Sequence, residues 1–96
     1  MDQHAYIVTY DIKDPKRLRK VFRLMRGYGE WLQYSVFQCR LSAVRRAEMH
    51  ATLEELMNLK EDHVLILDLG IADNLDLRVT SLGKAFEAVS HEPVII

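Results

Sequence analysis

Residues 6–25 read YIVTYDIKDPKRLRKVFRLM, and this stretch decides the fold. It opens with β-branched and aromatic residues and has no Gly or Pro before Asp11, a composition typical of a strand. Apolar side chains fall on both alternating faces, so we expect the strand at residues 5–10 to lie in the interior of its sheet. Asp11 ends this strand, at its junction with the segment that follows.

Asp14 and Pro15 predict the start of a helix, because an aspartate cap followed by proline at the first helical position is a typical N-terminal signal. Gly27 and Gly29 predict its end. Apolar residues recur within it at spacings of three, four and seven, which forms one apolar stripe. The stripe consists of Leu18, Val21, Phe22 and Met25.

The rest of this helix surface is basic. Its cations are Lys16, Arg17, Arg19, Lys20, Arg23 and Arg26. No acidic residue follows Asp14 within the helix, whereas a solvated helix usually mixes both signs. Two interpretations stay open from charge alone: a solvated face, or a surface that contacts the phosphate backbone of a nucleic acid.

The 96 residues, 1–96, correspond to a single domain with a formal net charge of −1. Residues 1–46 hold ten Lys and Arg against four Asp and Glu, and residues 47–96 hold three against ten. This division predicts two surfaces with different partners. Cys39 is the only cysteine, so no intramolecular disulfide and a cytoplasmic location are expected. We expect neither a signal peptide nor a membrane partner.

Residues 31–41, WLQYSVFQCRL, can be read in two ways. They form either one long strand of a parallel sheet or a hairpin that turns near Gln33–Ser35. A second helix is predicted from a Ser42 cap to about Lys60. Strands are then predicted at residues 63–69, at residues 77–82 and at the C-terminus, residues 93–96.

The resulting pattern is α+β: βαββαβ plus a terminal strand, with two helices on one face of a four-stranded sheet. The strands at residues 5–10 and 63–69 are apolar on both alternating faces. A monomer would therefore expose an apolar sheet face, which monomeric proteins avoid. We expect a homodimer packed sheet on sheet, with residues 93–96 adding to the edge of the partner's sheet.

Asp11 is the candidate for chemistry. A carboxylate at the end of an interior strand, beside a helix start, lies where sheet proteins bind ligands, although an ordinary turn aspartate has the same position. One Asp11 is a poor Mg²⁺ site, but two copies brought together by a two-fold axis could share an ion. Cys39 is expected in the core. The histidines show no metal-ligand spacing, and these are His4, His50, His63 and His91.

The chain resembles the family of CRISPR-associated protein two. The resemblance lies in YIVTYDI, DPKRLRKVF, GYGEWLQYSVFQCRL, HVLILDLG and RVTSLGKAFE. It implies a ferredoxin-like fold, a homodimer, and Mg²⁺ or Mn²⁺ held by Asp11 as the catalytic residue. The positions that flank the site in the family correspond to Tyr10, Arg19, Ser35 and Phe37. Some relatives carry a basic residue just before QYSVF, where this chain has Trp31 and Leu32, and this difference favours a DNA-scaffold role over RNA cleavage.

The family is the small partner of the CRISPR integrase, protein one, in spacer acquisition, and is also described as a metal-dependent endonuclease or endoribonuclease. The first hypothesis is therefore a dimer that binds duplex DNA without sequence preference and bridges the integrase. A second is a stand-alone Mg²⁺-dependent nuclease acting on RNA or DNA. The third, a ferredoxin-like regulatory dimer that binds a metabolite, is disfavoured because it has no use for six unpaired cations.

Overall fold

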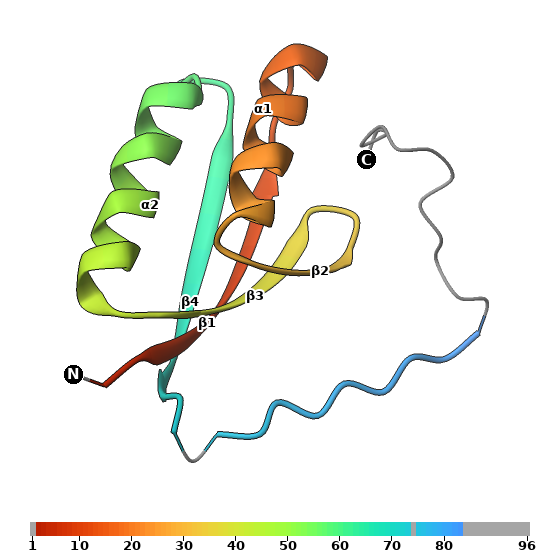
Figure 1. Cartoon of the computed structure of the whole chain (residues 1–96). Coiled ribbons are helices and arrows are strands. Elements are labelled where there is room, and N and C mark those ends of the chain that lie inside the picture. The colour runs from red at the N-terminus through yellow and green to blue at the C-terminus, as the bar shows by residue number, and fades with distance from the viewer. Residues whose placement is uncertain (1, 74, 84–96) are drawn as a thin grey trace.

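The computed structural model describes residues 2–73 and 75–83. The elements in chain order are β1 (His4–Asp11), α1 (Pro15–Arg26), β2 (Gly29–Gln33), β3 (Val36–Leu41), α2 (Ala43–Leu56) and β4 (His63–Ile71) (Figure 1). The sheet order is β2-β3-β1-β4, and all neighbouring strands are antiparallel. The structure thus confirms the predicted βαββαβ pattern and the interior position of β1.

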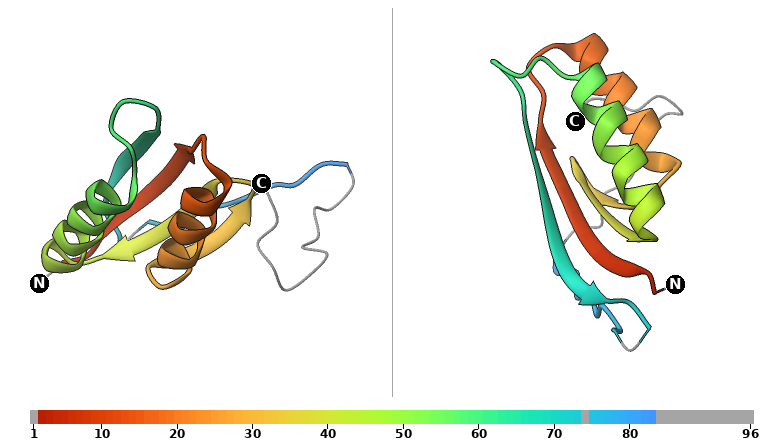
Figure 2. Two further views of the ribbon diagram at one scale, coloured as in Figure 1. Left: turned by 90° about the horizontal axis from the view of Figure 1, so that it is seen from above. Right: turned by 90° about the vertical axis from the view of Figure 1, so that its left-hand side faces the viewer.

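Both helices cover the same face of the sheet (Figure 2). The core lies between the two layers and consists mainly of Tyr6, Val8, Tyr10, Val21, Phe22, Met25, Phe37, Cys39, Leu41, Met49 and Leu53. Three members of the predicted α1 stripe belong to it, and Leu18 packs at its margin. Within the described ranges, neither helix has the length and apolar character needed to cross a bilayer.

The ends of α1 follow the predicted signals. The Asp14 carboxylate accepts hydrogen bonds from the backbone N–H groups of Lys16 and Arg17, both at 3.0 Å, and Pro15 is the first helical residue. Gly27 caps the other end, where its N–H donates to the carbonyl of Leu24 at 3.0 Å. The Asp14 cap thus satisfies backbone N–H donors that the first helical turn would otherwise leave unpaired.

A hairpin, rather than one long strand, joins residues 29–41. β2 and β3 are antiparallel neighbours, and the chain reverses at residues 34–35. Tyr34 adopts a positive φ of 42°, and the Trp31 indole donates a hydrogen bond to the Tyr34 carbonyl at 2.7 Å. This turn decides between the two interpretations of the segment and makes the sheet antiparallel.

The predicted end of the second helix, near Lys60, is wrong. α2 begins after the Ser42 cap as expected but ends at Leu56. A tight turn follows, in which the Asn58 carbonyl accepts from the Asp62 N–H at 2.8 Å and the Asn58 side chain accepts from the Lys60 N–H at 2.9 Å. Such local bonds offer the backbone an alternative to continuing the helix.

The strand predicted at residues 77–82 is also wrong, since the described residues after β4 form no strand. A strand needs a neighbour for its backbone hydrogen bonds, and no described strand pairs with this segment. Arg40 binds the chain just before this segment, donating to the carbonyls of Ala72 and Leu75, each at 3.1 Å. The strand predicted at residues 93–96 lies outside the described residues.

Candidate functional site

The side of the sheet away from the helices carries the candidate site. Strand side chains alternate between faces, and Tyr6, Val8 and Tyr10 lie in the core between sheet and helices. The intervening residues of β1 therefore point away from the helices, as do their cross-strand partners on β3 and β4. We call this surface the open face, and it comprises Ala5, Ile7, Thr9, Asp11, Val36, Gln38, His63, Leu65 and Leu67.

The centre of the open face is apolar and accessible. Leu65 is 49% exposed and Leu67 is 45% exposed, and they lie opposite Thr9 and Ile7 of β1. A single chain thus leaves large apolar side chains of an edge strand in water, as the sequence predicted. Clusters of this kind usually mark an interaction surface.

Asp11 lies at one corner of the open face, at the C-terminal end of β1. Its side chain is 71% exposed, and its ion-pair partner is Lys13, with Nζ 3.6 Å from Oδ2. An exposed pair of this length contributes little to stability, so the carboxylate is available to a ligand. The structure therefore places Asp11 on an accessible surface, beside apolar side chains.

Three of the four residues expected to flank Asp11 lie together behind it. The Tyr10 and Phe37 rings are stacked with centroids 6.3 Å apart, and the Tyr10 N–H donates to the Ser35 carbonyl at 3.2 Å. Burial raises the pKa of the Tyr10 phenol, and the nearby Ser35 side chain offsets only part of that rise. The phenol oxygen is buried without a hydrogen-bond partner in the described structure. These residues pack under the end of β1, whereas Arg19 is exposed on α1.

Asp62, which sequence reasoning did not identify as important, fixes the loop that follows Asp11. Its side chain is fully buried, and it accepts hydrogen bonds from the Lys13 N–H at 2.9 Å, the Asn58 N–H at 2.8 Å and Arg17 Nε at 2.8 Å. The Arg17 bond is the main reason that the pKa of Asp62 falls to about 2. No local sequence signal reveals this role, because two of the three partners are distant in the chain.

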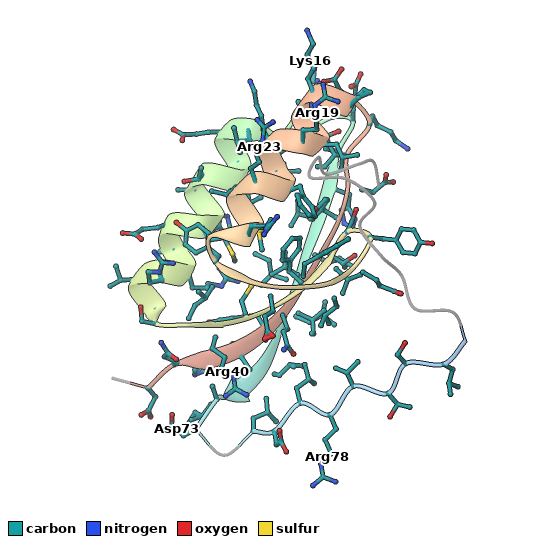
Figure 3. All side chains as sticks on the ribbon, turned by 45° about the vertical axis from the view of Figure 1, so that its right-hand side comes forward. Lys16, Arg19, Arg23, Arg40, Asp73 and Arg78 are labelled. Carbon is teal, nitrogen blue, oxygen red and sulfur yellow. The ribbon has the colours of Figure 1, made fainter. Side chains whose placement is uncertain are left out.

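The basic surface of α1 is present, with one exception. Figure 3 shows Lys16, Arg19 and Arg23 projecting from α1 into solvent. Arg17 instead pairs with Asp62 and with Glu61, whose Oε1 lies 3.1 Å from Arg17 Nη2. Arg17 is therefore engaged within the fold. The exposed cations of α1, which we call the basic face, are Lys16, Arg19, Lys20, Arg23 and Arg26.

The described part of one chain does not supply a complete metal-ligand set. Among residues 2–73 and 75–83, no three His, Cys, Asp or Glu side chains gather where they could hold an ion. Mg²⁺ usually binds one or two carboxylates together with water and phosphate oxygens. The exposed carboxylate of Asp11 fits a divalent ion as one donor of such a set.

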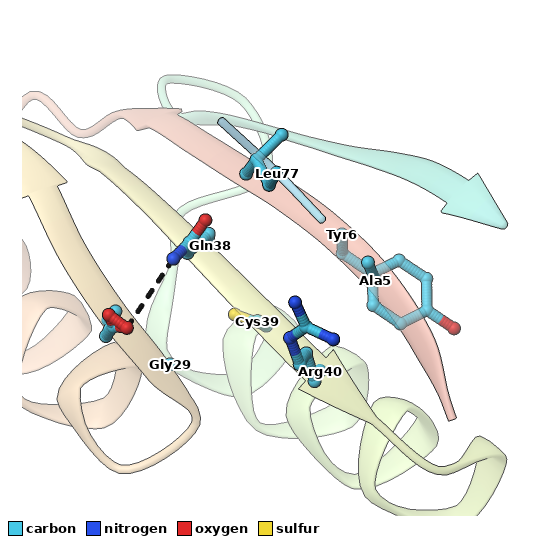
Figure 4. Close-up of a pocket in the computed structure, with 8 residues that line it drawn as sticks. Ala5, Tyr6, Gly29, Gln38, Cys39, Arg40 and Leu77 are labelled. Carbon is cyan, nitrogen blue, oxygen red and sulfur yellow. Dashed lines mark hydrogen bonds between the residues drawn. The ribbon is translucent and has the colours of Figure 1, made fainter. Parts of the chain in front are cut away.

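A shallow groove of about 210 Å³ lies near the N-terminal end of β1 and shares Ala5 and Gln38 with the open face (Figure 4). It is lined by Ala5, Tyr6, Gly29, Glu30, Gln38, Cys39, Arg40 and Leu77. Cys39 is buried there, and burial raises the pKa of its thiol to about 11, which fits the predicted core role. Asp11 does not line this groove. The candidate site is thus an exposed corner of the sheet and lies outside this groove.

Comparisons with known proteins agree with this description. The family described as "CRISPR associated protein Cas2" matches residues 4–75. The chain is 57% identical over 94 residues to the CRISPR-associated endoribonuclease Cas2 1 of Rhodospirillum rubrum, covering 98% of this chain and 92% of the relative. It is 50% identical over 94 residues to the CRISPR-associated endoribonuclease Cas2 of Geobacter sulfurreducens, covering 98% of this chain and 99% of the relative.

Solved structures show the same fold. The crystal structure of Streptococcus pyogenes Cas2 at pH 6.5 matches with a TM-score of 0.71 and 33% identity, covering 82% of this chain and 99% of that one. A hypothetical protein from Thermus thermophilus matches with a TM-score of 0.73 and 29% identity, covering 86% and 96% of the two chains. Sequence and fold lead to the same conclusion: this chain belongs to the CRISPR-associated protein Cas2 family.

Proposed function

We propose that the protein is a homodimeric subunit of the CRISPR adaptation complex that binds the backbone of duplex DNA and cleaves phosphodiesters in a metal-dependent reaction. The observation that carries the proposal is the position of Asp11 at the corner of an exposed apolar sheet face. The surface that calls for a second copy of the chain is therefore the surface that holds the candidate catalytic carboxylate. Family membership adds the CRISPR context.

The dimer would bury the apolar centre of the open face. Sheets that pack face to face are separated by about 10 Å, close to the span of two opposed carboxylate side chains with an ion between them. Leu65 and Leu67 would pack against their symmetry mates, and the two Asp11 carboxylates would approach each other. Like charges that are close repel, and a divalent cation relieves the repulsion.

The proposed reaction is hydrolysis of a phosphodiester. The Asp11 carboxylates of the two copies would hold Mg²⁺ or Mn²⁺, and the chemistry that such an ion supplies when bound is a water of lowered pKa as nucleophile and neutralisation of charge on the phosphate. Asp11 itself holds the ion. Asp62 and the Tyr10–Phe37 pair keep the end of β1 in place, and Arg19 is the cation of α1 proposed to contact the substrate. The relatives from Rhodospirillum rubrum and Geobacter sulfurreducens are named endoribonucleases, so RNA is one candidate substrate.

The basic face supports the second part of the proposal, which is the binding of duplex DNA. Its five exposed cations occur twice in a dimer and contact phosphates without reading bases. Binding of this kind suits a subunit that holds the middle of a DNA segment while the CRISPR integrase acts at its ends. The metabolite-binding alternative is disfavoured, because an exposed basic helix and an open corner offer a small molecule no enclosure.

The test separates cleavage from binding. Asp11→Asn keeps the size of the side chain and removes its charge, so we expect the fold, the dimer and duplex binding to remain while Mg²⁺- or Mn²⁺-dependent cleavage disappears. Lys13→Gln is the matched control, since it removes the ion-pair partner of Asp11 and leaves the carboxylate. Cleavage by Asp11→Asn at a rate comparable to that of the wild type would reduce Asp11 to a turn residue and refute the nuclease part of the proposal.

A further inference from the structure

His63 is the cross-strand neighbour of Asp11. The register of β1 against β4 pairs Asp11 with His63, Tyr10 with Val64 and Thr9 with Leu65. Side chains directly opposite each other in an antiparallel pair share one face, with Cβ atoms about 4.5–5.5 Å apart. A carboxylate and an imidazole therefore stand side by side on the open face, although they are far apart in the sequence.

The orientation of His63 follows from its neighbours on β4. Val64 and Ile66 pack against the core on the helix side, so His63 and Leu65 point to the open face. His63 is exposed, and no described residue forms a hydrogen bond or ion pair with its ring.

The other described histidines differ from His63. The Nδ1 atom of His4 lies 2.9 Å from the Asp68 carboxylate, and the Nε2 atom of His50 lies 3.5 Å from Glu54. Each of these rings has a partner within its own chain. Only the ring of His63, within the described part of the chain, has both nitrogens available beside a carboxylate that is itself exposed.

We propose that His63 is a metal ligand together with Asp11. This inference rests on the proposed function, because two copies meeting on the open face are needed to bring two Asp11–His63 pairs to one ion. The resulting donor set would be two carboxylate oxygens and two imidazole nitrogens, with water or substrate in the remaining positions. Imidazole is a ligand of transition-metal ions, most strongly of Fe²⁺, Ni²⁺, Cu²⁺ and Zn²⁺, whereas Mg²⁺ takes oxygen ligands. The pair therefore makes the site favour a transition-metal ion over Mg²⁺, and Mn²⁺ serves as the spectroscopic probe of that site.

The test uses Mn²⁺ alone, added to the full-length protein, and needs no cleavage assay. Electron paramagnetic resonance reports the affinity through the signal of free Mn²⁺, and electron spin-echo modulation reports nitrogen bound to the ion. We expect a nitrogen coupling in the wild type, its loss in His63→Ala, and at least a tenfold weaker affinity for Mn²⁺ in that variant. His4→Ala, at the opposite end of β1, is the matched control and should retain both properties.

The remaining outcomes separate the proposed role of His63 from the proposed metal site at Asp11. If the wild type binds Mn²⁺ through Asp11, so that Asp11→Asn weakens binding, but shows no nitrogen coupling, the role of His63 is overturned and the proposed function stands. If Asp11→Asn binds Mn²⁺ as tightly as the wild type, the Asp11 site itself is overturned, and the inference falls with it. Equal affinity for Mn²⁺ in His63→Ala and the wild type also contradicts the inference.

Discussion

Asp62 shows how a single buried residue can position a site that it does not touch. Its carboxylate accepts hydrogen bonds from the backbone of Lys13, two residues after Asp11, and from the backbone of Asn58 at the start of the α2–β4 turn. Arg17 of α1 donates to both of its oxygens, at 2.8 and 3.1 Å. One side chain thus joins the loop after β1, helix α1 and the start of β4.

The Asp62–Arg17 pair predicts acid sensitivity. The pKa of Asp62 in the folded state is about 2, against an ordinary value of 3.8. Because the folded pKa is the lower one, the stabilisation is complete above pH 3.8 and is lost as the pH falls toward 2. The linked free energy is about 2 kcal/mol. Urea unfolding at a series of pH values should show this loss in the wild type.

Asp62→Asn is the matched variant for that experiment. Removing one partner of a buried ion pair costs roughly 3–5 kcal/mol in the free energy of unfolding. Asp62→Asn should cost an amount near the lower end of this range at pH 7, because water can still solvate the partly exposed Arg17. It should also flatten the decline between pH 4 and pH 2. A decline of the same size in Asp62→Asn would assign the acid sensitivity to other carboxylates.

Gly29 is required by a close approach of β2 to β3. A Cβ atom placed there would lie 2.3 Å from the Gln38 carbonyl oxygen and 2.5 Å from the Cys39 sulfur. The backbone of Gln38 cannot yield without breaking the ladder, so Gly29→Ala should cost roughly 1–3 kcal/mol in the free energy of unfolding. Gly27→Ala is the control, since its nearest contact would be an ordinary 3.4 Å. Equal stability of the two variants in thermal or urea unfolding would contradict this account.

Among the helices and strands, the sequence predicted the features that depend on residues close together in the chain. The Asp14 cap, the Pro15 start and the apolar stripe of α1 are complete within a dozen residues, and they are confirmed. The hairpin was left open because the geometry that decides it, a positive φ at Tyr34, belongs to a residue that seldom adopts one. The end of α2 and the absence of a strand at residues 77–82 depend on contacts that the sequence pattern does not reveal.

The basic face of α1 predicts binding that is independent of sequence and steeply sensitive to salt. Each phosphate contact contributes about −0.9 to the slope of log affinity against log salt concentration. Replacing Arg19 with alanine removes one contact per chain, so the slope in a dimer should become shallower by about 2. Arg78→Ala, which removes an exposed cation beyond β4, is the control and should leave the slope unchanged. The slope is measured with duplex DNA by fluorescence anisotropy. An unchanged slope in Arg19→Ala would show that Arg19 does not contact the DNA backbone.

In the whole molecule, the open face carries both the apolar side chains proposed to form the dimer and the candidate catalytic residue Asp11. The position of Asp11 at a strand end made it a candidate from the sequence. Its neighbour His63 could not be identified in the same way, because the register of β1 against β4 sets that pairing. Arg17 also changed its expected role, since the acids that neutralise it come from the α2–β4 turn rather than from its own helix.

Sheet-on-sheet packing also predicts that loss of the dimer abolishes cleavage while Asp11 remains intact. Leu67→Glu places a charge at the centre of the open face, where dimer formation would have to desolvate it. Leu59→Glu makes the same substitution at an exposed position in the turn after α2, outside the open face. Both variants should keep the circular dichroism spectrum of the wild type, and only Leu67→Glu should lose metal-dependent cleavage.

Light scattering at micromolar concentration measures the molar mass in solution and so shows directly whether two copies of the chain associate. We expect twice the chain mass of 11.2 kDa for the wild type and for Leu59→Glu, and the mass of one chain for Leu67→Glu. A monomeric wild type, or a Leu67→Glu variant that keeps the mass of a dimer, would contradict the claim that two copies meet on the open face.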